Sequence, residues 1–245
     1  MTSSLQKIRQ SPLLARVVPF AVFAALTALQ GTLGESSRYW LYLTKTLVGA
    51  WLLWAVWPVV TELRWRLSWE AVVIGVGVFA LWVGLEGWYP SLDEVIDGLA
   101  RPVLLALGLE DMLSRPGSGA LWNPLAAFGN ASGLAWTFVV VRLLGVTLVV
   151  PPLEEVFYRS FLYRYLRKAD FESLPLAAFH LLAFLTTSAV FGLTHREWLA
   201  GILCGFAYQG LVCWKGRLGD AMTAHAITNL LLGAWVVAEG AWQFW

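Results

Sequence analysis

Apolar residues run through this sequence in long stretches that are separated by short polar or charged segments. A helix needs roughly 17 to 25 mainly apolar residues to cross a bilayer. The stretches of about that length cover residues 17–34, 39–60, 70–89, 133–150, 174–194, 198–214 and 220–239. The pattern therefore predicts an all-α fold, a polytopic bundle of about seven or eight transmembrane helices.

The pattern leaves the number of crossings open around Pro151-Pro152. Residues 133–168 are either one long element broken at these prolines, which gives seven crossings, or two elements, which gives eight. Proline is tolerated in the first turn of a helix, so we expect a helix to start at Pro151 and to place Glu154 and Glu155 in its positive N-terminal end. The segment 91–131, which is rich in Pro, Gly and charge, is a candidate interfacial or re-entrant segment.

Composition supports a membrane location. Of the 245 residues, 58% are hydrophobic and 13% charged, whereas a soluble domain has about a quarter charged. We expect a single membrane domain over 1–245, in contact with membrane lipid. The net charge of +1 offers no basic face for a nucleic acid. Basic residues precede the first apolar stretch, so we expect an integral membrane protein with its N-terminus in the cytoplasm.

Polar side chains interrupt the apolar stretches at three places in the C-terminal half. An ionisable side chain inside a membrane is costly unless it is paired or lines a wet cavity. The clusters are Glu154-Glu155-x-x-x-Arg159, Phe191-x-x-x-His195 and His225-x-x-x-Asn229. We therefore expect the three clusters to form one functional site.

Spacing within the clusters indicates which groups could do chemistry. Glu155 and Arg159 share a helical face, so an ion pair between them would leave Glu154, about 100° around the helix, for another role. His225 and Asn229 also share a face, and both can donate a hydrogen bond to developing negative charge. A carboxylate base, a histidine and two donors are the parts needed to hydrolyse an amide with activated water. The plainer interpretation is a structural ion pair and histidines that bond between helices.

The order of these motifs resembles the core of the CPBP family, the CAAX prenyl proteases and bacteriocin-processing enzymes. The similarity covers about residues 150–232, where 191–195 and 225–229 also look like that family. It implies a glutamate-dependent intramembrane endopeptidase with this segment as its catalytic core and no cofactor. Glu154 and His195 would match the pair that activates water. His225 and Asn229 would match the oxyanion donors, with Glu155 and Arg159 as supporting residues.

Zinc catalysis is the first alternative. Glu154, His195 and His225 could supply three zinc ligands and leave the fourth position to water. We rank this second, because the chain has no His-Glu-x-x-His pair and an asparagine such as Asn229 is a poor zinc ligand. A non-catalytic scaffold or immunity protein and an ion-coupled transporter are further alternatives.

The resemblance implies a membrane-associated or lipidated protein or peptide as the substrate, cut near its C-terminus. That substrate is either a prenylated CAAX-type tail or, as we favour, the hydrophobic C-terminal tail used by exosortase-type sorting systems. Arg142 has no acidic residue in its own apolar run, 133–150. It is expected either to pair with Glu154 or Glu155 or to snorkel, or else to attract a substrate carboxylate. Trp198 is the tryptophan near enough to His195 to contact substrate.

Overall fold

Helices make up the regular structure of this protein, and the all-α prediction is confirmed. The computed structural model describes residues 3–30, 32–107 and 121–245, and no strand occurs among them. The long single helices are α2 (Pro12–Ala28), α3 (Ser37–Val56), α4 (Trp69–Gly84), α10 (Leu181–Leu193), α11 (Trp198–Lys215) and α12 (Gly219–Glu239). The other pieces are α1 (Ser3–Gln10), α5 (Leu92–Ala106), α6 (Pro124–Phe128) and the turns Phe171–Ser173 and Trp242–Phe244.

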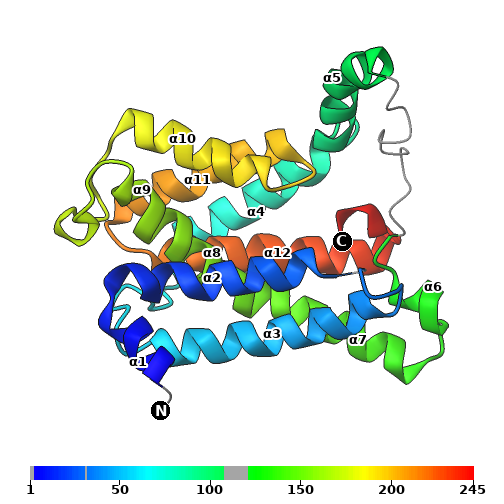
Figure 1. The fold of residues 1–245 in the computed structure, drawn as a ribbon, viewed down its shortest axis with the longest axis horizontal. Helices are drawn as coiled ribbons and strands as arrows, with labels where there is room; N and C mark the ends of the chain where they lie inside the picture. Colours follow the sequence, from blue (N-terminus) through cyan, green and yellow to red (C-terminus); the bar gives the residue numbers. More distant parts are fainter. Residues whose placement is uncertain (1–2, 31, 108–120) are drawn as a thin grey trace.

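The last long helix, α12, lies at the centre of the bundle. It packs against α4, α11 and α7, while α2 pairs with α3 and α10 pairs with α11 (Figure 1). Glycines allow these close approaches. A Cβ on Gly75 of α4 would lie 2.6 Å from the Ala224 carbonyl of α12, and one on Gly201 of α11 would lie 2.8 Å from Gly192 Cα of α10. Small residues in this way bring the helices that carry the polar clusters into direct contact.

Serine side chains begin several of the helices. Ser11, Ser68 and Ser132 each accept a hydrogen bond from the backbone N–H three residues further on, which satisfies a donor that the first helical turn leaves unpaired. Gly216 and Gly240 follow α11 and α12 in the left-handed conformation that suits glycine. The ends of these helices are therefore fixed by local sequence.

One continuous helical element runs from Gly133 to Tyr165, so the expected start of a helix at Pro151 is wrong. The element consists of α7 (Gly133–Leu144), a π-helical turn (Gly145–Val149), α8 (Val150–Glu155), a second π-helical turn (Val156–Leu162) and α9 (Tyr163–Tyr165). Glu154 and Glu155 therefore lie inside a helix and not at its positive N-terminal end. The choice between one long element and two is settled in favour of one.

The first π turn explains how the helix continues through two prolines. A proline lacks an N–H, and its ring clashes with the carbonyl four residues earlier in an α-helix. Here the Val150 N–H bonds to Gly145 O, five residues back, so the backbone widens just before Pro151. A wider turn relieves the clash and keeps the chain helical.

The segment expected to be interfacial or re-entrant contains α5. Its capping box joins Ser91 and Glu94, and none of its residues is buried. Apolar side chains such as Ile96, Leu99 and Val103 are exposed on it, and the helix projects away from the bundle (Figure 1). Residues 108–120 of that segment lie outside the described ranges.

Within the described ranges, two elements are long and apolar enough to cross a membrane, Gly133–Tyr165 and Gly219–Glu239, while α2, α4 and α10 are apolar but shorter. Large apolar side chains on the outside of the bundle are strongly exposed, among them Trp54 at 72% and Leu182 at 79%. Such a surface suits a lipid environment. The count of seven or eight crossings and the side of the N-terminus remain predictions.

A buried ionic cluster around Glu62 ties the loop after α3 to α2 and to the Gly133–Tyr165 element. Arg16 donates to both carboxylate oxygens at 2.8 and 3.0 Å, Arg164 donates at 3.1 Å, and Ser160 donates as well. Burial by itself would raise the pKa of Glu62, but the hydrogen bonds and charge of Arg16, with the Ser160 hydroxyl, lower it to about 2.

Acid is expected to destabilise the protein through Glu62. Its pKa is lower in the folded state than the ordinary 4.5, so its contribution is complete above that value and is lost as the pH falls toward 2. The shift corresponds to about 3 kcal/mol. We expect the melting temperature to drop between pH 5 and pH 3, and to drop less in Glu62→Gln. An equal drop in both proteins would contradict this role, and the exposed Glu35→Gln serves as the control.

Candidate active site

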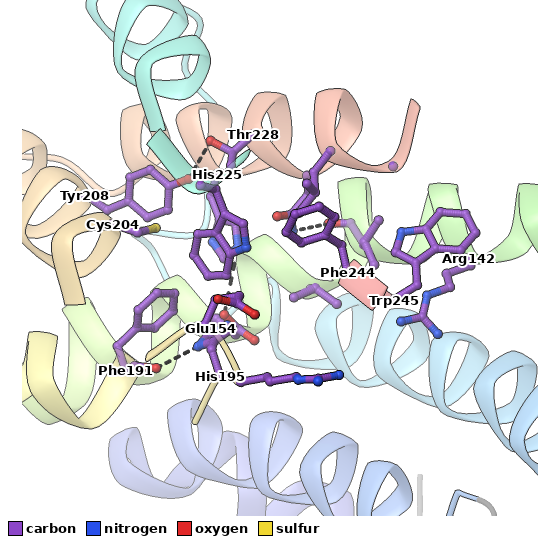
Figure 2. A pocket seen from close by; sticks show the side chains of 18 of the residues that line it. Arg142, Glu154, Phe191, His195, Cys204, Tyr208, His225, Thr228, Phe244 and Trp245 are labelled. Atoms are coloured by element: carbon purple, nitrogen blue, oxygen red, sulfur yellow. Dashed lines mark hydrogen bonds and ion pairs between the residues drawn. The ribbon is translucent and has the colours of Figure 1, made fainter. Parts of the chain in front are cut away.

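The three polar clusters meet at one cavity of about 230 Å³ inside the bundle. α8 contributes Glu154, the turn after α10 contributes His195, and α12 contributes His225 and Asn229 (Figure 2). Further lining residues are Trp82, Arg142, Val146, Val150, Phe191, Cys204, Tyr208, Thr228, Phe244 and Trp245. Residues far apart in the sequence are therefore brought to one mainly apolar site.

Glu155 is fully buried and holds two partners. His225 Nδ1 lies 2.9 Å from its Oε1, and Arg159 Nε lies 3.3 Å from its Oε2. The ion pair expected between Glu155 and Arg159 is present. The contact to His225 was not expected from the sequence, and it fixes the orientation of this imidazole.

Arg159 is held by charge and by aromatic rings. It is 1% exposed, and no described residue forms a hydrogen bond with its guanidinium nitrogens. The guanidinium lies over the Phe191 ring at 4.2 Å and near the rings of Tyr158 and Tyr208 at 5.6 and 5.7 Å. Cation–π attraction and the Glu155 carboxylate together compensate its buried charge.

Glu154 has the freer carboxylate of the two. Its side chain is 15% exposed toward the cavity, and its Oε2 lies 3.9 Å from His225 Nε2. No residue that the structure describes donates a hydrogen bond to that oxygen. The two adjacent glutamates therefore differ, because one is paired and buried and the other is available to a molecule in the cavity.

His195 lies in the turn after α10, two residues beyond the helix end. Its Nδ1 is 2.8 Å from the carbonyl oxygen of Phe191, which can only accept, so Nδ1 carries a hydrogen. The ring packs against Phe191 at 4.7 Å and Trp82 at 5.6 Å. In its neutral form this histidine therefore has an unprotonated Nε2 that can accept a proton.

Asn229 is tied to the first π turn. Its Nδ2 donates to the Val146 carbonyl at 2.8 Å. In a π turn that carbonyl would accept from the N–H five residues on, but this residue is Pro151, which has no N–H. The Val150 N–H, four residues on, already bonds to Gly145 O. The asparagine supplies the missing donor and keeps its second amide hydrogen for the cavity that it lines.

The segment that carries these residues is similar to a known protein family. Residues 135–231 match the family described as type II CAAX prenyl endopeptidase Rce1-like. This segment is similar to the CAAX-protease (CPBP) family. The match supports an intramembrane protease of the CAAX type in general, and with the apolar helices it supports an integral membrane protein. No curated protein and no solved structure matches the chain.

The CAAX-protease segment contains all six motif residues and also Trp198. Trp198, however, does not line the cavity. Its indole N–H donates to the Pro90 carbonyl at 3.0 Å, and its ring contacts Tyr89. The Tyr89 hydroxyl in turn accepts from the Ala200 N–H, and Leu92 N–H bonds to Arg196 O. Trp198 therefore anchors the turn that carries His195, and a direct contact to substrate does not follow from its position.

No preformed zinc site is present among the described residues of this CAAX-protease segment. Among the residues of the described ranges, no group of three His, Cys, Asp or Glu side chains is arranged to hold a metal ion. His195 uses Nδ1 for a backbone carbonyl and His225 uses Nδ1 for Glu155. Because each histidine keeps its Nε2 free, these two contacts do not decide against zinc, and Glu154, His195 and His225 stay the alternative set of ligands.

The residues that hold the His225 ring in place were not predicted from the sequence. Tyr208 stacks on His225 with ring centres 5.1 Å apart, and its hydroxyl donates to Thr228 at 2.7 Å. Thr228 in turn donates to Gly75 O of α4. Thr228 lies within the His225-x-x-x-Asn229 motif, but no spacing in the sequence connects it to Tyr208.

Proposed function

We propose that this protein is an intramembrane endopeptidase in which Glu154 and His195 activate water. The observation that carries this proposal is the cavity-facing Glu154 carboxylate, which has an oxygen without a protein donor. A general base needs a carboxylate within reach of water and substrate, and the Glu154 side chain, 15% exposed, lines the cavity. The CAAX-protease match of residues 135–231 supports the same class of reaction.

Hydrolysis would proceed through a tetrahedral intermediate. Glu154 takes a proton from water, the water oxygen bonds to the scissile carbonyl carbon, and the carbonyl π electrons move to its oxygen. The C–N bond then breaks, and the proton passes to the leaving amine. His195, with Nε2 as acceptor, orients the water and shares this proton. One water is consumed for each peptide bond.

The oxyanion would be stabilised by Asn229 and His225. Asn229 offers the amide hydrogen that Val146 does not use, and its orientation is fixed by that bond. His225 donates Nδ1–H to Glu155, so it must also be protonated at Nε2 to act as an oxyanion donor. The carboxylates of Glu155 and Glu154 lie 2.9 and 3.9 Å from its Nδ1 and Nε2.

The substrate proposed here is a membrane-associated protein that is cut near its C-terminus, with a hydrophobic sorting-type tail favoured over a prenylated one. The test uses the purified protein in liposomes with two peptides, one a farnesylated CAAX peptide and one an unmodified hydrophobic C-terminal tail. Mass spectrometry of the products identifies the cut bond. Cleavage of neither peptide would overturn the proposed function, and cleavage of the farnesylated peptide alone would overturn the preference for a sorting tail.

Chelation is expected to leave turnover unchanged. The proposed base and donors act without a metal, and the described His, Cys, Asp and Glu side chains form no three-ligand group. The measurement compares turnover before and after extensive treatment with a strong chelator, followed by metal analysis of the protein. If zinc specifically restored a lost activity, Glu154, His195 and His225 would have to be reassigned as ligands.

A further inference from the structure

Arg142 of α7 sits in an aromatic cage at the edge of the catalytic cavity. Its guanidinium lies over the rings of Trp122, Tyr42 and Trp245 at 4.4, 5.0 and 5.2 Å. Figure 2 shows it beside Trp245, away from the part of the pocket where Glu154 and His195 meet. Rings stacked on a guanidinium cover its faces, whereas the N–H donors point outward in its plane.

This guanidinium has no anionic partner among the described residues. It forms no ion pair or side-chain hydrogen bond there, and its Nε is buried. The ion pair considered with Glu154 or Glu155 is absent, because Glu155 is taken by Arg159 and His225. A cation in an apolar helix is costly without a counter-charge. The cage lowers that cost and keeps the donors free for an anion that enters the cavity.

The first π turn places Arg142 and Glu154 on one face of their helix. At about 100° per residue, a regular α-helix would separate two residues 12 positions apart by about 120°. A π turn holds one residue more than an α turn, which reduces this separation to about 20°. Both side chains accordingly line the same cavity, with their backbones about 16 Å apart along the axis.

We propose that Arg142 binds the free C-terminal carboxylate of the peptide substrate and thereby sets the position of the cut. This inference rests on the proposed function and names the group by which that site selects its substrate. A carboxylate matches the fork of N–H donors in a bidentate way. An extended chain advances about 3.3 to 3.6 Å per residue, so about 16 Å corresponds to a released fragment of roughly five residues.

The first experiment compares a substrate peptide with a free C-terminus and the same peptide as its C-terminal amide. Hydrogen bonds to a charged group predict a preference of about 10- to 100-fold in kcat/KM for the free acid. Arg142→Gln should abolish this preference mainly through KM. Arg142→Lys keeps the positive charge but lacks the bidentate N–H donors, so it should retain part of the preference for the free acid. Arg101→Gln on the exposed face of α5 is the control and should behave as the wild type.

The second experiment separates binding from cleavage. In the Glu154→Gln protein the free acid should bind more tightly than the amide, and Arg142→Gln in that background should remove the difference. Failure of the wild type to cleave with this binding difference intact would reject the proposed function alone. Cleavage of acid and amide at equal rates, as expected if Arg142 held a lipid phosphate, would overturn the carboxylate site.

A third readout requires no substitution. Lengthening the peptide beyond the cut site by one residue at a time should leave the released fragment near five residues, because the cut is counted from the C-terminus. A cut that stays at one sequence position whatever the length of the tail would reject this counting.

Discussion

Glu154→Gln is expected to lower turnover by a factor on the order of 100 or more while the protein keeps its melting temperature. Glutamine has nearly the same shape but cannot take a proton from water. Glu154 also makes no close pairing contact that holds the bundle together, since its Oε2 lies 3.9 Å from His225 Nε2, too far for a hydrogen bond. The measurement is kcat on the cleaved peptide in liposomes, together with thermal unfolding of the same preparation.

The exposed loop residue Glu35 provides the matched control, because Glu35→Gln removes the same charge away from the cavity. That variant should keep wild-type turnover. Near-wild-type cleavage by Glu154→Gln would remove Glu154 from the reaction and return the site to a structural interpretation.

Glu155→Gln is expected to act first on stability. This carboxylate is fully buried between Arg159 and His225, and the change leaves the Arg159 charge uncompensated among Phe191 and Tyr208. Removing one partner of a buried ion pair typically costs about 3–5 kcal/mol. For a chain of this length, that corresponds to a drop of roughly 10 °C in melting temperature. Differential scanning fluorimetry in detergent measures it.

A double variant distinguishes this explanation from a general packing defect. Glu155→Gln combined with Arg159→Met removes both charges and should recover part of the lost stability. Turnover should stay low, because His225 still lacks the carboxylate that orients it. A double variant less stable than Glu155→Gln alone would show that the charge pair is not the cause.

Hydropathy and short-range spacing predicted much of this molecule. Each expected apolar stretch contains a helix, and Glu155 with Arg159 and His225 with Asn229 lie where a spacing of four residues puts them. Such features depend on neighbours in the sequence, so a helical repeat is enough to find them. The assignment of chemical roles to Glu154, His195, His225 and Asn229 remains a prediction that the variants must test.

Long-range contacts and backbone irregularities could not be predicted in this way. The Glu155–His225 contact joins residues 70 positions apart, and the rings around Arg142 come from α3, from Trp122 and from the end of the chain. The run 133–150 is apolar almost throughout, so its pattern carries no sign of a π turn, and the prolines suggested a new helix where the chain instead widens. Trp198 is close to His195 in sequence, but its indole turns toward Pro90.

The bond between Asn229 and Val146 couples two distant positions, 151 and 229, in their effect on stability. Pro151 removes the N–H that Val146 O would receive, and the Asn229 amide replaces it from another helix. An alanine at 151 would restore a backbone N–H that competes with Asn229. A leucine at 229 would leave the Val146 carbonyl without a donor in an apolar interior. The proline and the asparagine therefore stabilise this turn as a pair, and substituting one is expected to change the cost of substituting the other.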